Sequence, residues 1–181
     1  KTSSGHRYTV NRTSTFNVTQ VSNTRFLVGK IYINNSSGPE LDLNALSVKS
    51  NLAINSKSNV LIYHTHTTEG YVESGAASNF HTTNTSLSVV GAGDTLERYL
   101  LMKNINVLHD RSRHDTSYND SYDDSLSYLE KIFAKKKYDI TIDLHRDAIS
   151  SNLYYGPTTT INGESVAKLM FVLYGTNFQF G

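Results

Sequence analysis

The chain has 181 residues, 38% of them hydrophobic and 18% charged, which is typical of one globular domain with a sizeable core. With 17 Lys and Arg against 16 Asp and Glu, the formal net charge of +1 gives no reason to expect nucleic-acid or membrane binding driven by bulk charge. The chain has no cysteine, which excludes disulfides, thiolate zinc sites and a cysteine nucleophile. No apolar run reaches the roughly eighteen residues of a transmembrane helix, and a start at Lys1 leaves room for an anchor upstream.

Residues 1–58 are rich in Thr, Ser and Asn and are predicted to form a β-prone N-terminal extension. Within them, residues 25–33 favour one strand or two edge strands, followed by turn residues at 34–39 and a helical turn over 41–46. The remaining residues, 59–181, are predicted to be an α/β domain that is incomplete at its C-terminus.

Strands and helices alternate through this second part. The predicted strands are 60–63, 105–108, 140–144 and 166–174, and a polar loop covers 75–88. Asp94 and Glu97 have the spacing of a capping box, which predicts a helix from there to about Asn104. A second helix is predicted to open at residues 123–125 and to end in a solvated lysine triplet, 135–137. This alternation predicts a mostly parallel open sheet with helices on both faces.

Two of the predicted strands end in histidines. His66 follows the strand over 60–63 and His145 follows the strand over 140–144. Because right-handed crossovers bring the carboxyl ends of parallel strands to one edge, we expect these two rings to meet. Glu69 lies three residues beyond His66, so the three side chains offer the two nitrogens and one oxygen of a catalytic zinc site with an open position. Zinc there would activate water to attack an amide or ester.

Other polar residues near these histidines are predicted either to support the ligands or to have one of two alternative roles. His64 shares a side of an extended chain with His66, so it is either a partner that orients a ligand or a reserve ligand. Asp143 lies two residues before His145 and suits support of that ligand better than proton transfer. Arg146 and Asp147 form either a structural ion pair or a grip on substrate.

The general acid or base is not identified, since Asp143, Asp147 and Glu73 are near in sequence but none is clearly placed. Four other histidines are expected to be surface or satisfied core residues: His6, His81, His109 and His114.

Several blocks of the chain resemble the stage II sporulation protein P family over about residues 59–175, and residues 1–58 add nothing to this resemblance. The blocks are LIYHTHTTE at 61–69, VG and GD at 90–94, YNDSYDDS at 118–125, IDLHRD at 142–147, and ING at 161–163 followed by KLMFV at 168–172.

The resemblance implies a zinc amidase or zinc exopeptidase-like fold and a zinc-dependent N-acetylmuramoyl-L-alanine amidase. Such an enzyme removes stem peptides from peptidoglycan during septum remodelling and engulfment in sporulating bacteria. The implied companion is a stage II sporulation protein D-like lytic transglycosylase. The implied location is outside the cytoplasmic membrane, at the septal or engulfing membrane, with an anchor upstream of Lys1. By motif, the implied ligands are His66, His145 and Glu69, with His64 in reserve.

In the resembled fold a catalytic glutamate lies on a late strand, which is expected beyond Gly181. We therefore expect these residues alone to bind zinc weakly and to hydrolyse peptidoglycan poorly. Two alternatives are a zinc endopeptidase or carboxypeptidase acting within the stem peptide, and a non-catalytic cell-wall binding or scaffold domain.

Overall fold

The computed structural model describes residues 18–22, 25–28, 31–34, 54–71, 80–147 and 158–172. The chain divides into two compact units, one formed by residues 54–155 and the other by residues 1–53 and 156–181. The predicted boundary between residues 58 and 59 lies close to the start of the first unit, and the two-domain organisation stays a prediction.

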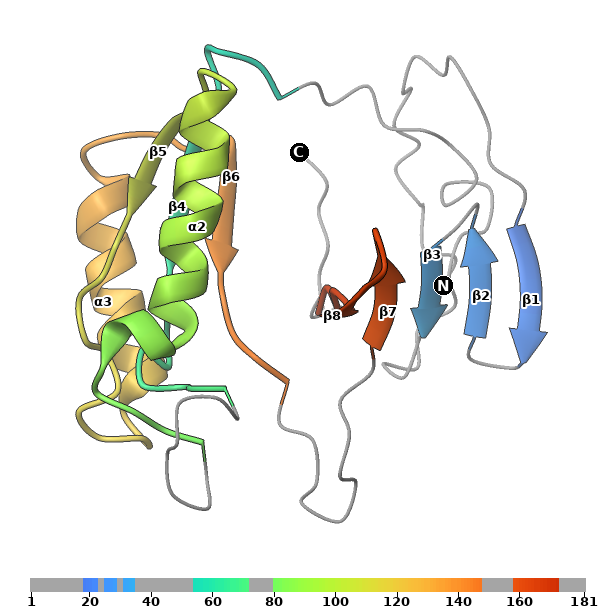
Figure 1. Cartoon of the computed structure of the whole chain (residues 1–181). Helices are drawn as coiled ribbons and strands as arrows, with labels where there is room; N and C mark the ends of the chain where they lie inside the picture. Colours follow the sequence, from blue (N-terminus) through green and yellow to red (C-terminus); the bar gives the residue numbers. More distant parts are fainter. Residues whose placement is uncertain are drawn as a thin grey trace, which may run out of the picture. The chain divides into compact units, whose positions relative to one another are not determined.

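A three-stranded parallel sheet forms the centre of the 54–155 unit (Figure 1). The strand β4 (Asn59–Tyr63) lies between β5 (Asn106–His109) and β6 (Ile140–Asp143). The register pairs Ile62 with His109 on one side and Tyr63 with Asp143 on the other. The carboxyl ends of all three strands therefore lie at one edge of the sheet, as the sequence predicts.

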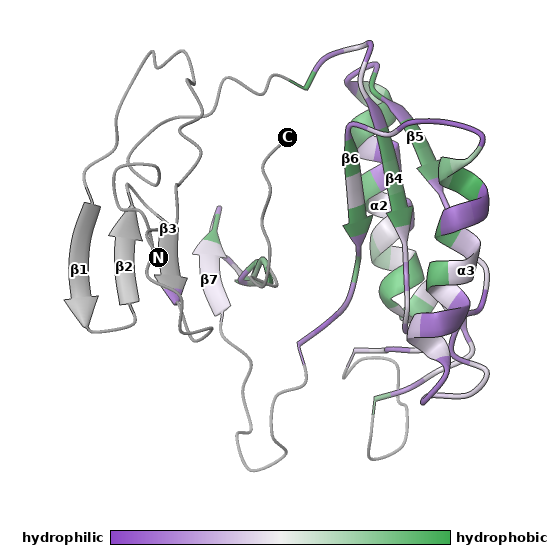
Figure 2. Ribbon diagram, turned by 180° about the vertical axis from the view of Figure 1, so that it is seen from behind, coloured by the Kyte–Doolittle hydropathy of each residue, from purple (hydrophilic) through white to green (hydrophobic). Residues whose placement is uncertain are grey.

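The apolar run of β4 is central because it is buried on both faces. Val60, Leu61 and Ile62 are each exposed by 1% or less, which is the pattern of a strand covered on both sides. Val60 and Ile62 form a core cluster with Ile105, and residues of the flanking helix and strands pack against it. Figure 2 shows the hydrophobic colouring concentrated in these strands.

The helix α2 (Val89–Met102) connects β4 to β5 and follows a short 3₁₀ helix, η2 (Thr85–Leu87). Its N-cap is Ser88, whose hydroxyl accepts a hydrogen bond from the amide of Val90 at 3.2 Å. The predicted N-cap, Asp94, is therefore wrong by six residues. The reason is that a buried serine cap, together with burial of Val89 and Val90, outweighs the poor helix propensity of two glycines.

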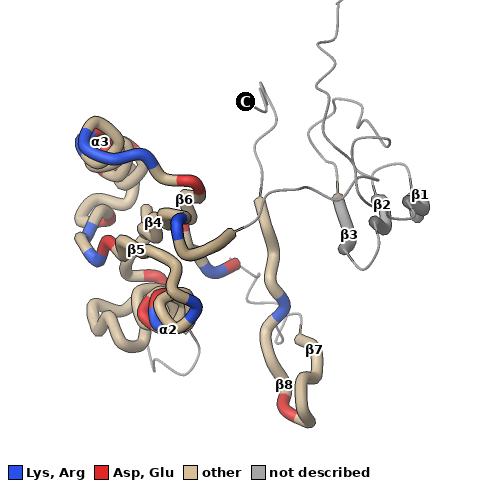
Figure 3. Tube along the Cα trace, turned by 90° about the horizontal axis from the view of Figure 1, so that it is seen from above, with Lys and Arg blue, Asp and Glu red and all other residues tan. Residues whose placement is uncertain are grey.

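The helix α3 (Ser121–Phe133) connects β5 to β6 and begins two residues before the predicted opening. Its buried positions are Ser121, Ser125 and Leu129, one residue every four, so a single narrow stripe faces inward. The following lysines, 135–137, are exposed as predicted, and Figure 3 shows the basic end of this helix. Neither helix of the described residues has the length and apolar character needed to cross a bilayer.

Among its described residues, the other unit contains two small antiparallel sheets. One is formed by β1 (Val18–Ser22), β2 (Arg25–Val28) and β3 (Ile31–Asn34). Of the two alternatives predicted over residues 25–33, the structure has two strands; β3 is an edge strand, but β2 is the central strand of this sheet. The turn residues 35–39 and the helical turn predicted over 41–46 lie outside the described residues.

The second sheet is the hairpin of β7 (Thr158–Ile161) and β8 (Glu164–Ala167). Asn162 and Gly163 join its strands with φ angles of 54° and 87°, the left-handed conformations of a type I′ turn. The predicted strand over 166–174 is therefore wrong: β8 ends at Ala167, residues 168–172 have no regular structure, and 173–174 lie outside the described residues. Leu169 and Phe171 are 87% and 86% exposed, so this apolar run lacks the burial that would favour a core strand.

Candidate metal centre

The turn that follows β4 carries two of the predicted zinc ligands, His66 and Glu69, and both are buried. Asp115 holds this turn in place. Its carboxylate accepts hydrogen bonds from the hydroxyl of Thr67 at 2.7 Å and from the amide of Thr68 at 2.9 Å, and the hydroxyl of Thr68 also donates to it. The pKa of Asp115 lies below its ordinary value because these hydrogen bonds outweigh the opposing effect of burial.

The rings of His66 and His145 meet as predicted, with their centroids 5.4 Å apart and their planes at 72°. His66 also stacks on Tyr118, at 4.7 Å and 10°, and lies edge-on to Tyr122 at 5.3 Å. The Nδ1 atom of His66 is buried and has no hydrogen-bond partner among the described residues. Burial lowers the pKa of His66, which favours the neutral ring that a metal requires.

Glu69 and His145 approach each other in a geometry suited to a shared ion. The distance from Glu69 Oε2 to His145 Nδ1 is 3.4 Å. Two ligands bound to one tetrahedral zinc at about 2.1 Å each would be about 3.4 Å apart. The backbone amide of Arg146 donates to the same Glu69 oxygen at 3.0 Å, which fixes that oxygen at the end of β6.

Asp143 binds the other nitrogen of His145, with 2.9 Å from Oδ2 to Nε2. Asp143 also accepts hydrogen bonds from the amide of Thr65 at 2.9 Å and from its hydroxyl at 2.7 Å. The contact with His145 is the one that the predicted supporting role of Asp143 requires, since metal-ligating histidines commonly donate their second N–H to a carboxylate. The role itself stays a prediction.

Two carboxylates on one ring strongly favour positive charge at this position. Hydrogen bonds to Asp143 and Glu69 raise the pKa of His145 to about 10. Burial alone would raise the pKa of Glu69, but the hydrogen bonds from His145 and the Arg146 amide lower it. A cation is therefore stabilised between these groups, either as a proton on His145 or as a metal ion in its place.

His66, Glu69 and His145 have the donor atoms that zinc prefers, but these atoms do not all lie close enough together to share one ion. The unpartnered Nδ1 of His66 and the spacing of Glu69 and His145 suit a site of two nitrogens and one oxygen. Within the described part of the chain, however, the one group of three whose ligand atoms all lie within 4.8 Å of one another is Asp94, Glu97 and His109. Metal binding at the predicted site thus requires loss of the His145 proton and a rearrangement that brings the three ligand atoms closer together.

His64 is fully buried and both of its ring nitrogens are engaged. Its Nδ1 lies 2.9 Å from the carbonyl oxygen of Leu144, and its Nε2 lies 2.8 Å from Nε2 of His109. These contacts occupy both ring nitrogens, which disfavours the role of a reserve ligand. They join His64 to Leu144 and His109 and not to His66, Glu69 or His145, so its role as a partner that orients a ligand stays a prediction.

Arg146 and Asp147 were predicted to form an ion pair or to grip substrate. Arg146 donates from Nε to the carbonyl oxygen of Gly70 at 3.0 Å and from Nη1 to the carbonyl oxygen of Asp147 at 3.3 Å. Arg146 therefore stabilises the turn that carries Glu69 by its hydrogen bond to Gly70. The substrate role of Arg146 and Asp147 stays a prediction.

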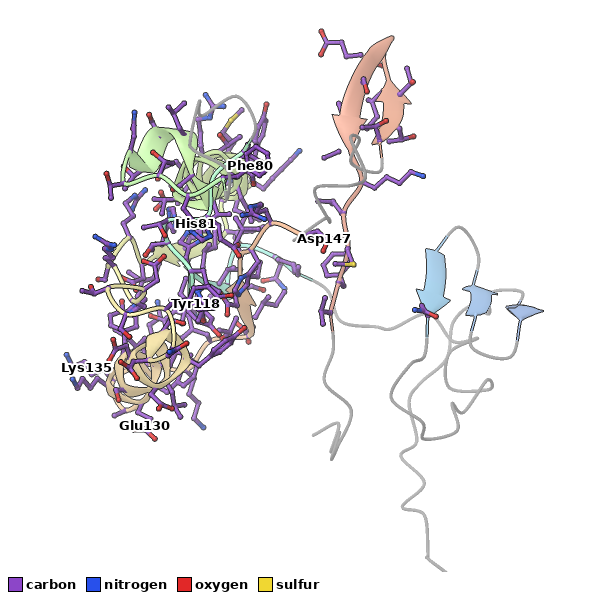
Figure 4. All side chains as sticks on the ribbon, turned by 90° about the horizontal axis from the view of Figure 1, so that it is seen from below. Phe80, His81, Tyr118, Glu130, Lys135 and Asp147 are labelled. Atoms are coloured by element: carbon purple, nitrogen blue, oxygen red, sulfur yellow. The ribbon has the colours of Figure 1, made fainter. Side chains whose placement is uncertain are left out.

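Figure 4 looks onto the carboxyl edge of the sheet, where Tyr118 and His81 are labelled, while Glu130 and Lys135 point away from α3. His81 is exposed, and its Nδ1 lies 3.1 Å from the hydroxyl of Thr68 in the turn that carries Glu69. His114 is buried against Asp110, with 2.7 Å between Nε2 and Oδ2. They are the surface histidine and the satisfied core histidine that the sequence predicts. His6 lies outside the described residues, as does Glu73.

The sequence reasoning did not identify Asp94, Glu97 and His109 as a cluster. His109 ends a strand just as the residues before His66 and His145 do, so the same rule about carboxyl ends would have found it. Asp94 and Glu97 were interpreted as a capping box, but they lie inside α2 and contact Arg111 and His109.

A comparison with protein families matches residues 6–181 to Stage II sporulation protein P. No curated protein and no solved structure matches the chain. The match begins well before residue 59, so the N-terminal residues also belong to the resemblance, contrary to the sequence-based expectation. The chain therefore belongs to the stage II sporulation protein P family, which has a role in sporulation.

Proposed function

We propose that this chain is the catalytic part of a zinc-dependent N-acetylmuramoyl-L-alanine amidase acting on peptidoglycan during septum remodelling and engulfment. The observation that carries the proposal is the meeting of His66, with its unpartnered buried Nδ1, and the Glu69–His145 pair at the carboxyl edge of the parallel sheet. Membership of the stage II sporulation protein P family supports the biological setting.

In this proposal His66, Glu69 and His145 bind the metal. Hydrogen bonds from neighbouring groups keep these ligands in position. Asp143 orients the His145 ring through Nε2, and the Arg146 amide fixes the Glu69 carboxylate. Zinc bound in such a site supplies a Lewis acid for the amide carbonyl and an activated water as nucleophile.

The substrate side of the site is proposed to include two tyrosines as well as Arg146 and Asp147. Tyr118 and Tyr122 flank His66 while remaining 65% and 62% exposed. Exposed aromatic faces beside a polar centre suit the apolar faces of sugar rings and short peptides. Arg146 offers a planar donor for a carbonyl or carboxylate of the stem peptide.

We also propose the zinc amidase-like arrangement, with helices on both faces of the sheet. The strand order β5-β4-β6 supports this, because successive right-handed crossovers that run in opposite directions put their helices on opposite faces. In Figure 3 the strands lie between α2 and α3. The proposed setting is extracytoplasmic, at the septal or engulfing membrane, with a stage II sporulation protein D-like lytic transglycosylase as companion.

The test is mass spectrometry of purified peptidoglycan after incubation with the chain. We expect slow, zinc-dependent and EDTA-sensitive release of stem peptides with a free L-alanine amino terminus, leaving intact muramic acid. His66→Ala should abolish this release. Glu130→Gln is the control, because this carboxylate is exposed on α3, and this variant should retain wild-type release.

Two outcomes would overturn the proposal. Cleavage inside the stem peptide would indicate an endopeptidase or carboxypeptidase instead. Saturable binding to cell walls with no new amino termini, in wild type and His66→Ala alike, would indicate a non-catalytic binding domain.

A further inference from the structure

A second group of potential ligands lies between α2 and β5. Asp94 and Glu97 are three residues apart on α2, so their side chains share one face of the helix. They face His109, the last residue of β5, whose Nδ1 lies 3.2 Å from Asp94 Oδ1 and 3.7 Å from Glu97 Oε2. One nitrogen and two carboxylate oxygens thus converge at the surface, and Asp94 is 48% exposed.

The Nδ1 atom of His109 is the feature that points to a ligand. The side chain of His109 is completely buried, and Nδ1 has no hydrogen-bond partner among the described residues although two carboxylates lie close to it. A buried polar atom without a partner is costly, so its persistence calls for an explanation such as an ion.

The tautomer of His109 can be worked out from its neighbours. The carbonyl oxygen of Leu144 can only accept, so the Nδ1 atom of His64 carries a proton and donates to it. In a neutral His64 ring, Nε2 must then accept, and the proton between the two rings belongs to Nε2 of His109. When His109 is neutral, the lone pair of its Nδ1 atom points toward Asp94 and Glu97. A lone pair facing two anionic oxygens is repulsive unless a cation lies between them, either a proton on Nδ1 or a metal ion.

The backbone around this cluster is shaped for the imidazole pair. A Cβ atom at Gly93 would lie 2.5 Å from Nε2 of His109 and 3.0 Å from Nε2 of His64. Only glycine at this position of α2 lets the two rings lie in contact and hold Nδ1 against the carboxylates. A histidine whose second ring nitrogen donates to a fixed partner is the arrangement typical of a metal ligand.

Arg111 is the cation at the cluster in the structure. Its Nε donates to Asp94 Oδ1 at 2.7 Å and its Nη2 donates to Glu97 Oε2 at 2.5 Å. The guanidinium has no acceptor, and its donors already point at the carboxylates, so it leaves the lone pair of His109 unsatisfied. Its side chain is 47% exposed, so it can move into solvent when a metal ion displaces it, at the cost of these hydrogen bonds.

We propose that Asp94, Glu97 and His109 form a second divalent-cation site, of the zinc class, which Arg111 blocks when the metal is absent. The ligand set of one imidazole and two carboxylates suits zinc and leaves a position for water. This site is separate from the one formed by His66, Glu69 and His145, and it does not depend on the proposed amidase activity.

The test measures zinc binding by calorimetry in a background that lacks the other site, the double variant His66→Ala, His145→Ala. We expect this background to bind one Zn²⁺, and the further changes Asp94→Asn and Glu97→Gln to abolish that binding. The matched control is Asp124→Asn with Glu130→Gln, two exposed carboxylates of α3, which should leave it intact. Circular dichroism checks that each variant folds.

Removing Arg111 should change the zinc affinity in the opposite direction to removing Asp94 and Glu97. Arg111→Gln removes a competitor held by charge-assisted hydrogen bonds and should tighten zinc binding by about 10-fold to 100-fold. Arg113→Gln is the control, because Arg113 contacts Asp115 at 3.4 Å and not this cluster.

Nuclear magnetic resonance on the unaltered chain tests the ligand atom directly. Long-range ¹H–¹⁵N spectra should show His109 protonated at Nε2 without metal, and zinc should shift its Nδ1 resonance. Zinc binding that is unaffected by Asp94→Asn and Glu97→Gln would overturn the proposal, as would an unchanged His109 Nδ1 resonance at saturating Zn²⁺.

Discussion

Nε2 of His64 lies 2.8 Å from Nε2 of His109, and this contact joins the turn after β4 to the end of β5. The rings are tilted by 65° with centroids 5.1 Å apart, so the contact is edge-on. Burial lowers the pKa of both histidines, which favours two neutral rings. One proton then lies between the two Nε2 atoms. Through His64 and the carbonyl of Leu144, the ends of all three parallel strands are tied together next to the candidate metal centre.

Gly93→Ala tests how tightly this histidine pair is packed. The new methyl group would lie 2.5 Å from a ring atom of His109, and overpacking of this kind costs about 1–3 kcal/mol. The gain in helix propensity from Gly to Ala is about 1 kcal/mol at most, so we expect a net loss in the free energy of unfolding, measured in urea. Thr95→Ala, on the exposed side of α2, is the control and should change it by about 0.5 kcal/mol or less. A Gly93→Ala protein as stable as wild type would show that the two rings can separate freely.

Asp143→Asn tests the support of His145. The carboxylate of Asp143 holds Nε2 of this ring at 2.9 Å, and loss of such a partner typically weakens metal affinity by about 10-fold to 100-fold. We expect that decrease in zinc affinity by calorimetry, with His145 still able to bind. Glu130→Gln, an exposed change on α3, should leave the affinity unaltered. Equal affinities in Asp143→Asn and wild type would mean that His145 is not a ligand or that Asp143 does not orient it.

The three parallel strands could be predicted from the sequence because each is a short run of strand-forming residues between polar segments. The ends of the helices and strands were less predictable. Ser88 is a common residue in a Ser-rich stretch, and only its burial and its bond to the Val90 amide distinguish it as the cap of α2. The hydrophobic run over 169–172 resembles a strand by composition, but strand formation depends on partners that sequence periodicity does not reveal. The Asn162-Gly163 pair was the stronger local signal, since it requires a hairpin turn.

The meeting of His66 and His145 was predictable because topology alone brings the carboxyl ends of parallel strands together. The protonation state of His145 was not, because it depends on Asp143 and Glu69 reaching its two nitrogens from different strands. The cluster of Asp94, Glu97 and His109 was hidden because two of its members had a local explanation as a helix cap. Contacts between a helix face and a strand end depend on packing that local spacing does not specify.

Ser88→Ala tests the observed start of α2. The serine hydroxyl satisfies the free amide of Val90 in a buried position, and loss of an N-cap typically costs about 1 kcal/mol. We expect a decrease of that size in the free energy of unfolding, measured in urea. Ser86→Ala is the control, because Ser86 is exposed and its hydroxyl contacts only the nearby Asn84 among the bonds described. If Ser88→Ala had no effect, the helix would not depend on this cap.

Asp115→Asn tests whether one buried carboxylate holds the turn that carries His66 and Glu69. Asp115 accepts hydrogen bonds from Thr67 and Thr68, and hydrogen bonds to a charged group contribute about 1.5–3 kcal/mol each. Removing the charge should lower the free energy of unfolding at pH 7 by about 2–3 kcal/mol. It should also weaken zinc binding, because the ligands lose their fixed turn.

The contribution of Asp115 to the free energy of unfolding should depend on pH, and the direction follows from its pKa. The pKa of Asp115 in the folded chain lies below its ordinary value of 3.8, so the unfolded chain takes up the proton first as pH falls. The stabilisation is therefore complete above about pH 4 and is lost as pH falls through the lower folded value. The free energy of unfolding in urea, measured between about pH 2 and pH 4, should change less steeply with pH for Asp115→Asn than for wild type. Thr67→Val, which removes one donor, should give an intermediate slope, and identical slopes in all three proteins would contradict this role for Asp115.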